Sequence, residues 1–185
     1  YRRDGEKMPL AAVLGGDPAV LLAASVRLAP EVEACVLAGL LRERPIDVVP
    51  CRTVQLLVPA EAEIVIEGYV DPAEPPVQAG PMTGPSGHYC LGRRGAVMHV
   101  TALTHRANPI FPAAVPDDPP HELCTISRAL TCIFKPLVNM AIPEMVDCDL
   151  PMFGAGRHWA TVSIRKTYAG QARRVAHAAW GLEAL

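Results

Sequence analysis

The sequence has no block of basic residues, no closely spaced cysteine pair, and no apolar run long enough to cross a membrane. Its 17 Lys and Arg residues face 19 Asp and Glu residues, a formal net charge of −2, so we expect no nucleic acid and no anionic membrane as a partner. The longest apolar runs, such as AVLLAASV, fall far short of the roughly 18 residues of a membrane-spanning helix. GxGxxG, P-loop and GxSxG motifs are also absent from the sequence, which removes the commonest nucleotide and serine-hydrolase signatures.

The six cysteines are scattered along the chain, at positions 35, 51, 90, 124, 132 and 148. Four of them stand in apolar segments, where a thiol serves as a small core residue. No two have the spacing of zinc ligands, so the pattern predicts no metal site. Six cysteines in a secreted chain would instead suggest three disulfides. Of the two readings we favour reduced thiols, and with them a cytoplasmic protein.

Half of the residues are hydrophobic and only 19% are charged, which indicates a folded chain and not a disordered one. The low charge also suggests that some apolar surface is covered by a partner or by more of the same chain. A length of 185 residues suits one ordinary domain. We therefore expect residues 1–185 to form a single domain that associates with other subunits.

The predicted elements run strand, two helices, several strands, helix, strand and helix. Asp17-Pro18 gives an N-cap and a first-turn proline to the first helix. The expected strands cover 8–16, 46–59, 62–70, 96–106, 108–115 and 158–168, the expected helices cover 19–28, 31–43, 119–141 and 170–185, and the proline-rich segment 71–87 is expected to be irregular. Strands that cluster in the middle of the chain favour an α+β fold with an antiparallel sheet or barrel over a doubly wound fold. We place the barrel at residues 46–166, with the helix at 123–140 packed against it.

Five strings, in this order and spacing, resemble the UbiD-type decarboxylases, the 3-polyprenyl-4-hydroxybenzoate decarboxylase family: LGGDPAVLLAAS, LAGLLRERPIDVV, VPAEAEIVIEGYV, THRANPIFPA and IRKTYAGQARRV. The resemblance extends from Met8 to Trp180. It implies the central domain of that family, a split β-barrel of the flavin-reductase type with flanking helices. Members of the family are longer, and the resemblance implies that their N-terminal and C-terminal domains are absent here.

The resemblance also implies a chemistry, the reversible decarboxylation of aromatic or α,β-unsaturated acids on prenylated FMN. In the family a divalent metal and a potassium ion hold the phosphate of the flavin. A small-molecule acid would be the substrate, and a homo-oligomer or a larger UbiD-type subunit would be the partner.

This sequence departs from the family pattern where the resemblance places functional groups. The two carboxylates of the family's acidic loop fall on Ala79 and Gly84, within QAGPMTGPSGHYC, and the glutamate ligand of the metal falls on Ala34. A turn that borders the flavin reads Ser25-Val26-Arg27 here, so only the serine matches and these three are weak candidates for cofactor binding. Because a missing general acid costs about 10²–10⁴-fold in rate, we expect this chain alone to be inactive in the family reaction and to bind no cofactor tightly.

Three residues could take over the proton transfer, namely His88, His121 and Glu122. A histidine in a glycine-rich loop is more often a solvated surface residue, and His121-Glu122 resembles a pair at the start of a helix, where an acid is favoured. Three hypotheses therefore stay open: a UbiD-type carboxy-lyase seen in part, a non-catalytic binding or assembly subunit with a degenerate active site, and an enzyme with altered chemistry in the same pocket.

Overall fold

The computed structural model describes residues 5–25, 32–83, 89–114, 121–151 and 159–182. The chain divides into two compact units, and not into the single domain that we expected. The N-terminal unit comprises Tyr1–Met82 and Leu91–Ala113, and the C-terminal unit comprises Thr83–Cys90 and Ala114–Leu185.

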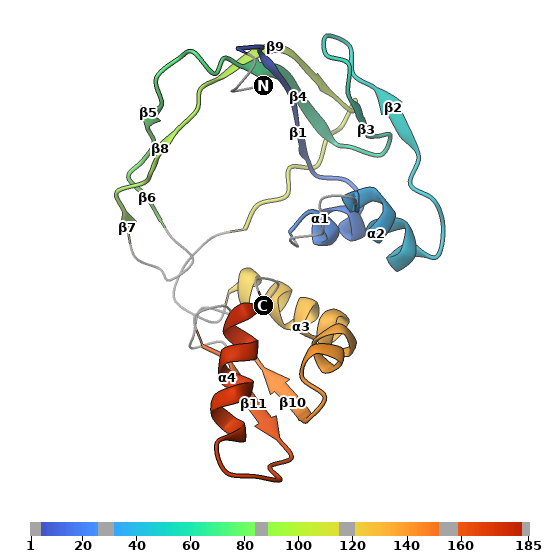
Figure 1. Ribbon diagram of the computed structural model, residues 1–185. Helices are drawn as coiled ribbons and strands as arrows, with labels where there is room; N and C mark the ends of the chain where they lie inside the picture. The colour runs from blue at the N-terminus through green and yellow to red at the C-terminus, as the bar shows by residue number, and fades with distance from the viewer. Residues whose placement is uncertain (1–4, 26–31, 84–88, 115–120, 152–158, 183–185) are drawn as a thin grey trace. The chain divides into compact units, whose positions relative to one another are not determined.

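A three-stranded antiparallel sheet organises the N-terminal unit (Figure 1), with β4 (Ile64–Val70) between β1 (Met8–Leu14) and β9 (Met98–His105). β1 pairs with β4 without interruption, whereas the pairing of β4 with β9 shifts register between Glu67 and Gly68. A Cβ at position 68 would overlap the carbonyl of His99, so the strand needs glycine where the two backbones come closest. The strands expected at 8–16, 62–70 and 96–106 are thus confirmed.

The remaining strands of the N-terminal unit are short and pair in twos. β2 (Val48–Pro50) pairs with β3 (Leu57–Pro59), and β5 (Val77–Gln78) pairs with β8 (Arg94–Gly95). At the boundary between the units, β6 (Met82–Thr83) pairs with β7 (Tyr89–Cys90). The proline-rich segment 71–87 therefore contains two short strands where none was expected, and the described residues 108–114 form no strand.

No closed barrel is found among the described strands, which form one three-stranded sheet and four two-stranded sheets. The expectation that the barrel extends to residue 166 is wrong. β11 (Thr161–Ile164) pairs with β10 (Met145–Asp149) in the C-terminal unit and with no strand of the N-terminal unit.

Two short helices complete the N-terminal unit, α1 (Pro18–Ala24) and α2 (Ala34–Arg42). The side chain of Asp17 accepts a hydrogen bond from the Ala19 amide at 2.7 Å, as the sequence predicted for an N-cap. Asp17 also forms an ion pair with Arg42 at 2.9 Å, which ties the start of α1 to the end of α2. The helices pack through small residues, since Ala23 and Ala38 are both buried.

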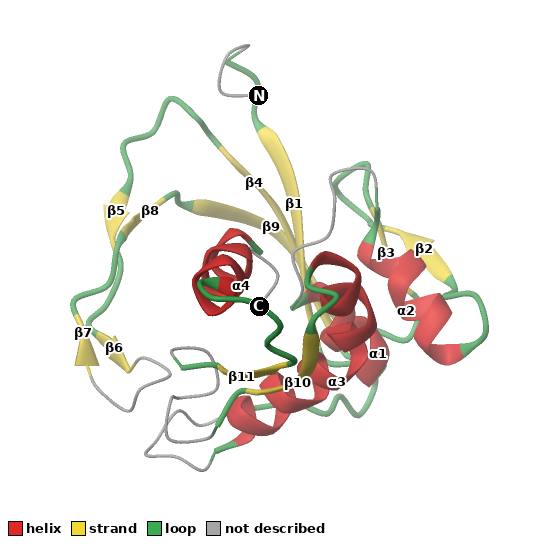
Figure 2. Ribbon diagram, turned by 60° about the horizontal axis from the view of Figure 1, so that its bottom comes forward, coloured by secondary structure: helices red, strands yellow, loops and turns green. Residues whose placement is uncertain are grey.

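The C-terminal unit packs two helices, α3 (Glu122–Ala141) and α4 (Gln171–Gly181), around the β10–β11 pair (Figure 2). Its core consists of Val138, Ile142, Met145 and Val175. Both helices were expected, α3 from its helical pattern, and α4 begins after Gly170 as predicted. In the described part of the chain, no helix has the length and the apolar character needed to span a bilayer.

Candidate functional site

The hairpin of β5 and β8 contains Ala79, the first of the positions that the family resemblance singled out. The amide of Ala79 donates to the Arg93 carbonyl at 3.2 Å, and the Gln78 amide group donates to the Leu91 carbonyl at 2.7 Å. Gly92 has a φ of +71°, and a Cβ there would overlap the carbonyl of Ala79. Only glycine permits so close a backbone contact, so position 79 is held in a defined place.

The charged side chains of the hairpin are basic, and none is acidic. Residues 77–95 contain Arg93 and Arg94 but no Asp or Glu. Ala79 is exposed and presents a methyl group, while Gly84 and His88 lie outside the described residues. A guanidinium stays protonated at any physiological pH, so these arginines can attract an anion but cannot exchange a proton with it.

Among the described residues of the N-terminal unit, the most deeply buried carboxylate is that of Glu67, in the string EIVIEG. Its side chain is 1% exposed and accepts hydrogen bonds from the Arg52 amide at 2.9 Å and from the Thr53 amide at 2.6 Å. The Thr53 hydroxyl donates to it at 2.8 Å and lies 2.6 Å from the hydroxyl of Thr101. The hydrogen bond from the Arg52 amide is the main cause that lowers the pKa of Glu67, and the donors from Thr53 add to it.

Glu67 therefore stays ionised and anchors segment 51–54 to the sheet, which is a structural role. Sequence reasoning did not single it out, although one charged residue inside an apolar strand is a usable signal. Burial raises the pKa of the neighbouring Cys51 thiol, and the charge of Glu67 adds to that shift. A thiol with a raised pKa is a poor nucleophile.

Ala34, which the resemblance aligns with the metal glutamate of the family, is the first residue of α2. Glu33 precedes it as the N-cap residue with an extended backbone, and its side chain makes no capping hydrogen bond. Among the described residues, no group of three or more His, Cys, Asp or Glu side chains could hold a metal ion.

Of the three cofactor-binding candidates, the structure describes only Ser25. This residue is the C-cap of α1, and its hydroxyl donates to the Leu22 carbonyl at 2.7 Å. Val26 and Arg27 lie outside the described residues. Ser25 thus caps the C-terminal end of α1.

His121 and Glu122 stand at the start of α3. The carbonyl of His121 accepts from the Cys124 amide at 3.0 Å, and Glu122 is the exposed first residue of the helix. His121 is buried. These positions agree with the reading of the pair as the beginning of a helix.

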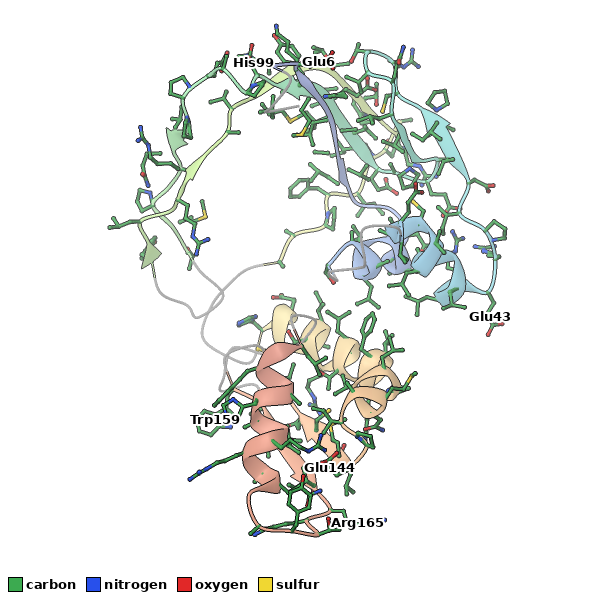
Figure 3. All side chains as sticks on the ribbon, viewed as in Figure 1. Glu6, Glu43, His99, Glu144, Trp159 and Arg165 are labelled. Carbon is green, nitrogen blue, oxygen red and sulfur yellow. The ribbon has the colours of Figure 1, made fainter. Side chains whose placement is uncertain are left out.

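A polar network in the C-terminal unit explains the string RKTYAGQA. Gln171 is 4% exposed, and its carbonyl oxygen accepts from the Thr167 amide at 2.6 Å. Its amide nitrogen donates to the Glu144 carboxylate at 3.2 Å, which also accepts from Arg174. Arg174 in turn donates to the Tyr168 hydroxyl at 3.1 Å. The network joins the start of α4 to Glu144, the residue that precedes β10 and that is labelled in Figure 3.

The C-terminal unit also contains an apolar pocket of about 520 Å³ between α3, α4 and the β10–β11 pair. Its lining includes Val138 of α3, Ile142 just after α3, Val162 and Ile164 of β11, and Val175 of α4. The alanines Ala172, Ala176 and Ala179 line the α4 side, and Trp159 and Trp180 stand among the lining residues with 58% and 78% of their surface exposed.

Comparison with known proteins identifies the family. Residues 1–119 match the family model of the 3-octaprenyl-4-hydroxybenzoate carboxy-lyase Rift-related domain, and residues 124–185 match the model of the C-terminal domain of the same carboxy-lyase. The second match corrects our expectation that the C-terminal family domain is absent. Its boundary with the first match agrees with the division of the chain into two units.

Two relatives, from Archaeoglobus fulgidus and Aquifex aeolicus, are each 42% identical to this chain, over 179 and 181 residues. The matches cover 97% and 98% of this chain but 37% of either relative, so the chain spans little more than a third of their length.

Solved structures of UbiD-class enzymes have the same fold. The enzyme HmfF from Pelotomaculum thermopropionicum, in an evolved dimeric form with prFMN, is 31% identical with a TM-score of 0.84 and covers 97% of this chain and 42% of its own. The vanillic acid decarboxylase of Sedimentibacter hydroxybenzoicus is 25% identical with a TM-score of 0.79 and covers 99% of this chain and 39% of its own. This chain therefore belongs to the UbiD family of carboxy-lyases.

Proposed function

We propose that this chain is a binding and assembly part of a UbiD-type carboxy-lyase and that it does not itself supply the acids of the decarboxylation. It provides the framework that surrounds the flavin in its relatives and part of their C-terminal domain. The carboxylates that exchange the proton, and the glutamate that binds the metal, come from another polypeptide or from other residues of a complete assembly.

One observation carries the proposal, namely that the hairpin at position 79 keeps a demanding geometry but holds no acid. The backbone contact between Ala79 and Gly92 tolerates no side chain at position 92, and the Ala79 amide is bonded across the hairpin. A segment without a role would not need this fit. The scaffold thus supports a binding site, while the side chain of Ala79 cannot accept or donate a proton.

The charges of the hairpin suggest what it binds. Arg93 and Arg94 stand on the strand opposite Gln78 and Ala79, and guanidinium groups pair well with carboxylates. A small aromatic or unsaturated acid is the ligand class that fits both this charge and the family. In such a site the arginines orient the carboxylate of the ligand, and no described side chain of the hairpin protonates the product.

The test is a decarboxylation assay with prenylated FMN supplied in excess. Carbon dioxide release is measured from cinnamic, 4-hydroxybenzoic and vanillic acids, with the vanillic acid decarboxylase of Sedimentibacter hydroxybenzoicus as the positive control. We expect release at the level of the blank, and we expect the flavin to separate from the protein on gel filtration.

A double variant, Ala79→Glu with Gly84→Glu, is assayed beside the wild-type chain as the matched comparison. It restores the two family carboxylates without changing Gly92 or the arginines. If the wild-type chain releases carbon dioxide above the blank, the proposal is wrong. If the double variant is also no faster than the wild-type chain, the two missing acids are irrelevant to that release.

A further inference from the structure

The two arginines of the β5–β8 hairpin stand on opposite faces of it. In this antiparallel pair Gln78 lies directly opposite Arg94. The Ala79 amide donates to the Arg93 carbonyl at 3.2 Å, so the register continues by one step and places Ala79 opposite Arg93. Residues that lie opposite each other share a face, and successive residues of a strand alternate between faces. Arg93 therefore shares a face with Ala79, and Arg94 shares the other face with Gln78.

The face of Arg93 combines one cation with small or apolar residues. This Arg93 face consists of Val77, Ala79, Arg93 and Gly95. All of these residues are exposed, and 56% of the surface of Val77 is accessible. A Cβ at Gly95 would have no atom within 4 Å, so the space above this glycine is open. A flat apolar group can approach the backbone there.

The opposite face is polar, and its neutral side chain is already engaged. The side-chain amide of Gln78 donates to the Leu91 carbonyl at 2.7 Å and to the Gly92 carbonyl at 3.3 Å. Arg94 thus has an amide group as its cross-strand neighbour, where Arg93 has a methyl group. Only the Arg93 face offers a charge beside apolar surface.

The alanine at position 79 leaves the guanidinium of Arg93 without a counter-charge. The Cβ atoms of opposite residues are about 4.5–5.5 Å apart, so a glutamate at position 79 could form an ion pair with Arg93. Among the residues that the structure describes, Arg93 takes part in no ion pair. A guanidinium binds a carboxylate through two parallel hydrogen bonds, which makes a carboxylate the ligand group that fits this position.

We propose that Arg93, and not Arg94, binds the carboxylate of an aromatic acid, whose ring lies over Gly95 beside Val77. The site is open because position 79 holds alanine, since a glutamate there would compete for the same guanidinium. The proposal rests on the proposed function and narrows its binding site to one arginine and one face of the hairpin.

The test is a titration of the ¹⁵N-labelled full chain with cinnamate, followed by nuclear magnetic resonance. We expect saturable shifts of the Val77, Ala79 and Gly95 amides and of the Nε–H group of Arg93, because the bound ring lies close to them. Cinnamamide has the same shape without the charge and is the control ligand. It should bind at least about tenfold more weakly, because hydrogen bonds between charged groups are stronger than those between neutral groups.

Two matched pairs of variants separate the Arg93 face from the charge of the hairpin as a whole. Arg93→Gln and Arg94→Gln each remove one positive charge, so they reduce the general attraction of an anion equally. We expect Arg93→Gln to weaken cinnamate binding at least about tenfold and Arg94→Gln to weaken it less than about twofold. Ala79→Glu should abolish binding, whereas Ala79→Gln, which has the same size without the charge, should retain it.

Equal weakening by Arg93→Gln and Arg94→Gln would overturn the assignment, because only the net charge of the hairpin would then matter. The same conclusion follows if cinnamamide binds as tightly as cinnamate, if Ala79→Glu binds as tightly as the wild-type chain, or if cinnamate shifts no resonance of the hairpin. The proposed function is tested by a different readout. Carbon dioxide release by the wild-type chain would refute the proposed function alone, while the choice between the two arginines is decided by the titration.

Discussion

Replacing Gln171 by alanine should destabilise the C-terminal unit far more than its position at the start of a helix suggests. The side chain is 4% exposed and makes three hydrogen bonds. Its carbonyl oxygen accepts from the amide of Thr167 at 2.6 Å and from the hydroxyl of Thr167 at 3.3 Å, and its amide nitrogen donates to Glu144 at 3.2 Å.

The size of the expected loss of stability depends on which buried groups the substitution leaves without a hydrogen bond. A typical intramolecular hydrogen bond contributes about 1 kcal/mol net, and a buried donor left unpaired costs about 1–3 kcal/mol. The Thr167 amide loses the short bond to Gln171, whereas Glu144 keeps its bond from Arg174. We therefore expect the free energy of unfolding to fall by about 2–3 kcal/mol.

The assay uses the intrinsic fluorescence of the chain, because both tryptophans belong to the C-terminal unit. For a unit of this size each kcal/mol lowers the midpoint of thermal unfolding by about 4–8 °C, so a decrease of about 8–24 °C is expected. The control is Arg173→Ala, an exposed residue of the same helix turn, which should change the free energy of unfolding by less than about 0.5 kcal/mol. If Gln171→Ala lowers the midpoint no more than Arg173→Ala does, the network does not hold α4 and the reasoning fails.

Two further predictions concern the N-terminal unit. Gly92→Ala should open the β5–β8 hairpin, because the new Cβ would overlap the Ala79 carbonyl at a φ of +71°; faster hydrogen exchange at the Ala79 amide would show it, whereas Gly95→Ala, with no atom within 4 Å of its Cβ, should leave that exchange unchanged. Glu67→Gln tests the buried carboxylate by its pH dependence. Because the folded-state pKa of Glu67 is lowered, its stabilisation is present above the unfolded-state pKa and is lost as the pH falls through the folded-state pKa. The difference in urea midpoint between wild type and variant, followed by circular dichroism, should thus shrink on acidification, and a difference independent of pH would contradict the assignment.

The elements of this chain were largely predictable from local patterns, and their pairing was not. Apolar spacing predicted α3, a run rich in Val and Ile predicted β4, and the segment AVMHVTALTHR was also expected to be a strand, as β9 is. The extension of the barrel to residue 166 was wrong, because strand patterns carry no information about which strands pair at long range. β11 has an ordinary strand pattern, but its partner β10 reads MVDCD, a sequence with two aspartates and no clean alternation that nothing had marked as a strand.

The candidate site was predictable to a similar degree. The absence of acids at positions 34, 79 and 84 could be read directly from the sequence. The contact between Gly92 and the Ala79 carbonyl could not, since it depends on how two strands pair across the hairpin. The pocket of the C-terminal unit could not be predicted from the sequence either. It results from the packing of α3 and α4 on the β10–β11 pair, and β10 was not expected.

The strings that indicate the family are explained by the fold, which is why they predict membership better than activity. In LGGDP, Asp17 caps α1 and pairs with Arg42. In EIVIEG, Glu67 anchors segment 51–54 through two backbone amides and a hydroxyl. In RKTYAGQA, Gln171 joins α4 to Glu144. Each side chain is engaged with its own chain, so these strings can be present whether or not a catalytic acid stands at position 79. A resemblance built on them establishes the scaffold, and the chemistry must be decided at the hairpin, by the assay that compares the wild-type chain with the variant that carries both carboxylates.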